Sequence, residues 1–125
     1  MTLQVLPYLL AFLLLAVGLY AIVAKRNVIK VIVGLAILDY AVNLMLVLVG
    51  YRTTAGAAPT APILTGGMAN EPALVAGAVD PLPQALVLTS IVISLSVTAL
   101  LVALGLRLYE KYGTFDTQRM RNLRG

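Results

Sequence analysis

Residues 3–24 read LQVLPYLLAFLLLAVGLYAIVA, a run without a charged side chain that ends at Lys25 and Arg26. As an α-helix, a run of this length crosses a hydrocarbon core of about 30 Å. A cleaved signal peptide is the alternative, but its basic region should precede the apolar stretch, whereas these two basic residues follow it. We therefore predict that residues 3–24 span a membrane.

Two further runs have spanning length. Residues 28–50 are mostly apolar but contain Asp39 and Asn43 near their middle, and residues 84–106 form a third run. The chain is 61% hydrophobic and 11% charged, which leaves too little polar surface to cover a soluble protein of 125 residues. We predict an all-α integral membrane protein with three transmembrane helices, organised as a single membrane domain over residues 1–125.

The start of the third helix is marked by Asp80-Pro81-Leu82-Pro83. An Asp at this place can accept hydrogen bonds from free backbone N–H groups, and prolines in a first turn cost no helical hydrogen bond. Beyond residue 106 the helix can continue through Tyr109 and Tyr112 until Gly113 stops it.

The charged residues predict an orientation. Basic residues gather in the turn at 25–30 and in the tail 107–125, whereas the segment 51–80 carries one Arg and two acids. Lys and Arg favour the cytoplasmic side, so we expect a multi-pass protein of the cell membrane with the N-terminus outside and the C-terminus in the cytoplasm. Segment 51–80 is rich in Ala, Gly, Pro and Thr without helical periodicity, which predicts an extended, partly irregular external loop.

Several function classes are disfavoured by composition. The chain has no Cys and no His, which removes thiol chemistry, imidazole bases and the commonest metal ligands. No phosphate-binding loop, catalytic carboxylate pair or activated nucleophile is present. The net charge of +4 follows from the basic residues beside the spans, so nucleic acid is a poor partner hypothesis. We expect no catalytic residue, no cofactor and no metal site.

Asp39 is the only acid inside a predicted span. An ionisable group at mid-membrane costs about 2.5 to 3.5 kcal/mol on insertion scales and usually faces a protein interior or a wet cavity. It can take part in an ion path, or it can serve only to hold its helix against a neighbouring subunit. Asn43 lies one turn further along the same side and extends the polarity.

The third span carries hydroxyl groups on two faces. Ser90, Ser94 and Thr98 recur at every fourth residue and predict a weakly polar ridge for close helix contact, whereas Thr89 and Ser96 mark another face. The alternative is that each hydroxyl only bonds back to a carbonyl of its own helix. Two polar faces favour a helix that packs on more than one side.

The segment DPLPQALVLTSIVI, residues 80–93, resembles the signature of the C subunit of Mrp-type multi-subunit cation/proton antiporters. Residues 18–20, 25–27, 34–35 and 41–44 also resemble that family. The family is similar to the three-helix K subunit of respiratory complex I, and related subunits occur in membrane-bound hydrogenases and sulfane reductases.

This resemblance implies a non-catalytic membrane subunit of an Mrp-type Na⁺/H⁺ antiporter, with the lipid bilayer and other membrane subunits as partners. The first alternative is the matching subunit of a redox-driven complex such as a membrane-bound hydrogenase or sulfane reductase. The second, a stand-alone scaffold or small transporter, has little support in the sequence.

The resemblance has two departures at functional positions. Complex I relatives carry intramembrane glutamates at places that align with Ala36 and Val97, so neither acid is present here. Asp39 lies about one turn beyond Ala36 and supplies a titratable group on roughly the same face. The candidates for an ion path or for coupling are Asp39, Asn43, Ser94 and Thr98.

Overall fold

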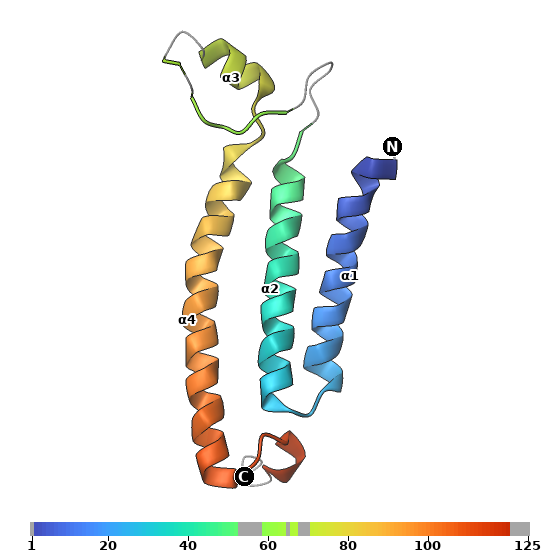
Figure 1. Cartoon of the computed structure of the whole chain (residues 1–125), viewed down its shortest axis with the longest axis vertical. Helices are drawn as coiled ribbons and strands as arrows, with labels where there is room; N and C mark the ends of the chain where they lie inside the picture. Colours follow the sequence, from blue (N-terminus) through green and yellow to red (C-terminus); the bar gives the residue numbers. More distant parts are fainter. Residues whose placement is uncertain (1, 53–58, 65, 68–70, 121–125) are drawn as a thin grey trace.

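The computed structural model describes residues 2–52, 59–64, 66–67 and 71–120. Its long helices are α1 (Thr2–Ala24), α2 (Val28–Gly50) and α4 (Pro81–Tyr112), and all three are long and apolar enough to cross a membrane. Figure 1 shows them side by side in one layer, with α2 between α1 and α4. This arrangement confirms the predicted all-α class with three transmembrane helices.

Close packing of α1 against α2 depends on glycine. An added Cβ at Gly18 would lie 2.8 Å from the backbone nitrogen of Leu38, and one at Gly34 would lie 2.7 Å from the Cβ of Ala21. Ala11 on α1 and Ala41 on α2 are fully buried. Small residues let two backbones approach closely, which is the usual basis of helix association in a membrane. The first two spans therefore form a tightly packed helix pair.

The ends of α4 follow the local signals in the sequence. The side chain of Asp80 accepts a hydrogen bond from the backbone N–H of Leu82 at 3.0 Å, and Pro81 opens the helix. At the other end Gly113 adopts a left-handed conformation with φ of 69° and terminates the helix. Both predictions are confirmed. With 32 residues, α4 is about 48 Å long and extends well beyond a hydrocarbon core.

The two polar faces of α4 have different surroundings. Ser90, Ser94 and Thr98 are partly buried on the side that packs against α2, and Gly105 is buried beside Val28 and Ile32. Thr89 and Ser96 are exposed, and their hydroxyls donate to the carbonyls of Ala85 and Val92 in their own helix. The close-contact interpretation is thus confirmed for the first face, whereas on the second face the hydroxyls bond back to their own helix.

The segment before α4 contains a short helix that the sequence pattern did not predict. α3 (Glu71–Gly77) lies within the stretch expected to be an irregular loop, so that expectation was wrong for these seven residues. The guanidinium of Arg52 donates to the carbonyl oxygens of Val75 and Ala78, each at 2.6 Å. A cation at the carbonyl end stabilises a helix. Because Arg52 lies more than twenty residues earlier, local periodicity could not reveal this support.

The C-terminal segment folds back onto the turn between α1 and α2. The carbonyl of Phe115 accepts from the N–H of Val28, and both the N–H and the hydroxyl of Thr117 donate to the carbonyl of Arg26, at 2.7 and 2.9 Å. The ring of Phe115 stacks on Tyr109, with centroids 4.5 Å apart. These contacts connect the segment after α4 to the turn between α1 and α2. The basic residues Arg121 and Arg124 lie outside the described residues.

The outer surface of the layer is strongly apolar. Exposed large side chains occur on every long helix, for example Val23 at 77%, Val49 at 77% and Leu95 at 72% exposure. In water such a surface would aggregate, whereas lipid chains or partner helices can cover it. The single layer therefore fits a membrane protein whose faces are completed by lipid and by other chains.

Candidate functional site

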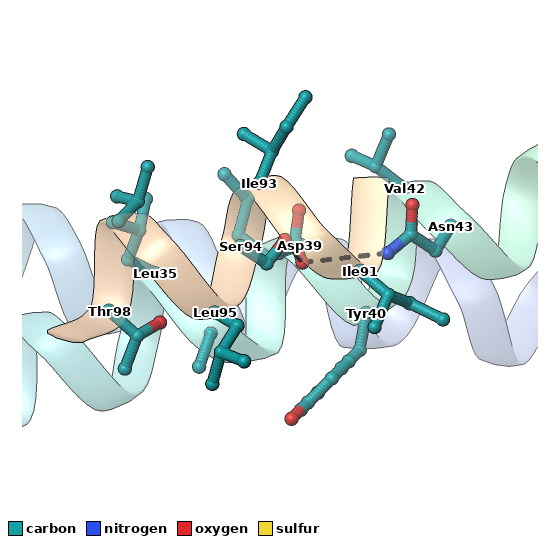
Figure 2. Close-up of a pocket in the computed structure, with 13 residues that line it drawn as sticks. Leu35, Asp39, Tyr40, Val42, Asn43, Ile91, Ile93, Ser94, Leu95 and Thr98 are labelled. Atoms are coloured by element: carbon teal, nitrogen blue, oxygen red, sulfur yellow. Dashed lines mark hydrogen bonds between the residues drawn. The ribbon is translucent and has the colours of Figure 1, made fainter. Parts of the chain in front are cut away.

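A groove of about 480 Å³ lies between the middle parts of α2 and α4. Figure 2 shows the residues that line it, with the polar side chains at its centre and large apolar side chains around them. Tyr40 and Leu95 are 67% and 72% exposed, so the groove opens at the outer surface of the chain. The lining residues are Leu35, Ala36, Leu38, Asp39, Tyr40, Val42, Asn43, Ile91, Ile93, Ser94, Leu95, Val97 and Thr98.

Asp39 is the central group of this groove. The hydroxyl of Ser94, on α4, donates a hydrogen bond to Oδ2 of Asp39, on α2. The side-chain amide of Asn43 donates to the same oxygen from one turn away, at 3.5 Å. Figure 2 shows the three side chains turned toward one another. Asp39 therefore connects two helices and uses one carboxyl oxygen for both contacts.

Two acceptor oxygens in the groove have no partner within the described part of the chain. No hydrogen bond from a described residue reaches Oδ1 of Asp39. Asn43 is buried, with 8% of its surface exposed, and its Oδ1 is shielded from solvent without a hydrogen-bond donor. An unpaired buried acceptor is unfavourable, and more so in hydrocarbon than in water. The groove is thus deficient in donors.

The described residues also supply no cation to the Asp39 carboxyl. The nearest basic residue along α2 is Lys30, nine positions earlier, which corresponds to about 13 Å of helix. On α4 the first basic residue after Ser94 is Arg107, about 20 Å further along the axis. A carboxyl group in this position can bind a proton, a cation or an external hydrogen-bond donor.

The structure brings together three of the four candidate residues. Asp39, Asn43 and Ser94 are joined by hydrogen bonds, whereas Thr98 lines the groove one turn further along α4 without a side-chain bond to them. Ala36 and Val97, the positions at which the resemblance to complex I subunits implies glutamates, line the same groove. Both positions therefore lie in the same region of the molecule as Asp39.

Some groove residues were not singled out from the sequence. Tyr40 lines the groove beside Asp39, and Ile91 and Leu95 form its wall on α4. An aromatic residue next to the only intramembrane acid was an available signal for Tyr40. Ile91 and Leu95 resemble every other apolar residue of their span, so no local signal distinguishes them.

Other acids lie away from this groove. Asp80 caps α4 and Glu71 begins α3, both in the segment that connects α2 to α4. Among the described residues, no cluster of three acidic, His or Cys side chains is arranged to hold a metal ion. The polar chemistry of the spans is concentrated around Asp39.

Known proteins with similar sequences include subunits of Na⁺/H⁺ antiporters. Over residues 6–125 the chain matches the family described as NADH-ubiquinone/plastoquinone oxidoreductase chain 4L. The C subunit of the Na⁺/H⁺ antiporter of Alkalihalophilus pseudofirmus is 37% identical over 118 residues, which cover 94% of this chain and 95% of that protein. The corresponding antiporter protein of Bacillus subtilis is 36% identical, with 94% of each chain covered.

A solved structure is similar as well. A chain in the membrane-bound sulfane sulfur reductase, an archaeal respiratory membrane complex, is 42% identical to this one and superposes with a TM-score of 0.75. The match covers 90% of this chain and 94% of the other. The agreement in sequence and in fold extends over nearly the whole of both chains. The protein therefore belongs to the family of NADH-ubiquinone/plastoquinone oxidoreductase chain 4L.

Proposed function

We propose that this chain is the C subunit of an Mrp-type Na⁺/H⁺ antiporter, a non-catalytic membrane subunit that helps to assemble and line the ion-translocation module. The observation that carries the proposal is the similarity to the C subunits of Na⁺/H⁺ antiporters along almost the full length of both proteins. The single layer of helices supports it, because three helices in a row cannot enclose a hydrated route by themselves.

In this role the groove between α2 and α4 borders the ion path. Asp39 is held at mid-span by Ser94 and Asn43, and Thr98 extends the polar surface along α4. A carboxyl group that can exchange a proton or contact a passing cation serves coupling, and its hydrogen bonds keep it oriented. Asp39 is the coupling residue in this proposal, and the other three position it or extend its surroundings.

A second candidate function has a specific observation in its favour. The similarity to a chain of the sulfane sulfur reductase complex is at least as high as that to the antiporter subunits. In such a complex the chain would occupy a comparable place, while other subunits would carry the redox centres. The composition of the native complex distinguishes the two candidates.

The test is isolation of the complex from the native membrane through an affinity tag on this chain, followed by identification of its subunits. Reconstituted in liposomes, the complex should exchange Na⁺ for H⁺, as monitored by a pH-sensitive dye after a Na⁺ pulse. Liposomes that contain this chain alone serve as the control and should show no exchange above background. Copurification of metal-cluster proteins would favour the redox complex, and exchange by the single chain would contradict both candidates.

A further inference from the structure

The groove around Asp39 has too few hydrogen-bond donors, and no positively charged side chain of the described residues reaches it. Both observations concern the side-chain oxygens of Asp39 and Asn43. Oδ2 of Asp39 is occupied by Ser94 and Asn43, but Oδ1 of Asp39 and Oδ1 of Asn43 receive no bond from the described residues. The carbonyl oxygen of Asn43 is shielded from solvent, so a group that enters the groove from outside meets Oδ1 of Asp39 instead. A group that completes the site from the open side of the groove must bring at least one donor to Oδ1 of Asp39.

The chain itself cannot supply this group from its described helices. Lys30 and Arg107 lie about 13 Å and about 20 Å along the helix axes from Asp39 and Ser94, respectively, beyond the reach of a side chain. A lipid acyl chain can fill the space but carries no donor. The occupant must therefore be a polar group that another molecule carries to the middle of the membrane.

The shape of the groove indicates which kind of structure carries that polar group. Its walls are apolar and exposed, with Ile91 and Leu95 from α4 and Tyr40 from α2. A groove between two neighbouring helices accepts the side-chain ridge of a third helix. Only a helix satisfies its own backbone groups at this depth. The walls and the polar centre thus fit one occupant, a transmembrane helix with a positively charged side chain near its middle.

We propose that the groove between α2 and α4 is the docking site for a transmembrane helix of a partner subunit, whose Lys or Arg side chain binds Oδ1 of Asp39. Either cation can donate to this oxygen, and its charge compensates the Asp39 carboxylate. The inference rests on the proposed assembly into a multi-subunit complex and names the contact that holds this chain in it.

The test is photo-crosslinking within the native complex. A benzophenone amino acid replaces Leu95, which lines the groove and is 72% exposed, while Asp39 stays intact. The control carries the same probe at Leu100, which is 60% exposed on the same helix but does not line the groove. We expect the Leu95 probe to capture a membrane-spanning peptide of another subunit with a central Lys or Arg, and the Leu100 probe not to capture that peptide.

A charge exchange follows the crosslink. Asp39→Lys should abolish copurification of the captured subunit, and replacing that subunit's basic residue by Asp should restore it. Restoration excludes simple misfolding of the Asp39→Lys chain. Capture of lipid, of a second copy of this chain or of a helix without a basic residue overturns the inference, and so does normal assembly of Asp39→Lys.

The outcome is separable from the proposed function. Na⁺/H⁺ exchange by the wild-type complex is measured in the same preparation. An active antiporter with only lipid in the groove contradicts the docking inference alone. A complex that assembles through the predicted helix but exchanges no Na⁺ contradicts the proposed function alone.

Discussion

Ser94 of α4 donates its hydroxyl hydrogen bond to Asp39 of α2, across 55 positions of sequence. The bond joins the third span to the second at mid-membrane and orients Asp39, the only acid inside a predicted span. Because Asn43 also donates to the same oxygen, the carboxyl group is held from both helices. The position of Asp39 is thus a property of the helix pair, and each residue of the cluster can be tested against a neighbour.

Ser94→Ala should weaken the contact between α2 and α4 by about 1 kcal/mol, the usual size of an interhelical hydrogen bond in a membrane. Ser96→Ala is the matched control, because Ser96 is exposed and bonds to Val92 of its own helix. We expect a lower thermal midpoint of the purified complex for Ser94→Ala and no measurable change for Ser96→Ala. Equal effects of the two substitutions would show that the bond to Asp39 has no special role.

Asp39→Asn removes titration and charge but preserves the size and much of the hydrogen bonding of the side chain, whereas Asp39→Leu also removes its polarity. If Asp39 exchanges protons or contacts the ion, both variants should lose most of the Na⁺/H⁺ exchange per assembled complex. Exchange is measured in liposomes over a range of pH, with assembly checked by copurification. Transport at the wild-type rate by assembled Asp39→Asn would leave Asp39 with a packing role only.

Gly18→Ala should separate α1 from α2, because the new Cβ would lie 2.8 Å from the backbone nitrogen of Leu38, which cannot move aside cheaply. Overpacking of this kind costs about 1–3 kcal/mol. Gly105→Ala is the control, since its nearest neighbour, a methyl group of Val28, lies at an ordinary 3.4 Å. Stability in detergent should fall for Gly18→Ala only, and a comparable loss for Gly105→Ala would contradict the close-packing argument.

The bias of Lys and Arg predicts which side of the membrane each connection occupies. The native chain has no Cys, so single-Cys variants give no background in labelling experiments. In intact cells a membrane-impermeant maleimide should label Ile63→Cys, which is exposed in the connection between α2 and α4, but not Arg119→Cys in the tail. The reverse labelling pattern would invert the proposed orientation.

Local sequence sufficed for the features that depend on one helix at a time. Three apolar runs of spanning length predict three helices, because in hydrocarbon a helix is the way for a single segment to satisfy its own backbone. Asp80 marks the start of α4 because its side chain accepts a hydrogen bond from a backbone N–H of the first turn. Gly113 marks the end because it adopts a left-handed conformation. The sequence also identified Asp39 and Asn43, because polar groups inside such runs are costly and rare.

The relations between helices could not be predicted in the same way. Lipid is as apolar as Leu or Ile, so an apolar side chain in a span does not reveal whether it faces a neighbour or the bilayer. The sequence separates the face of Ser94 from the face of Ser96, but only the structure shows that the hydroxyl of Ser94 reaches Asp39 and that the hydroxyl of Ser96 bonds to its own helix.

Contacts between distant segments were hidden for a related reason. α3 depends on Arg52, and the tail depends on the carbonyl of Arg26, contacts that no local pattern encodes. The sequence by itself thus determined the membrane class, the spans and the identity of the intramembrane acid. Only the tertiary structure decided which faces meet, since that choice depends on close packing and hydrogen bonds between segments far apart in the chain.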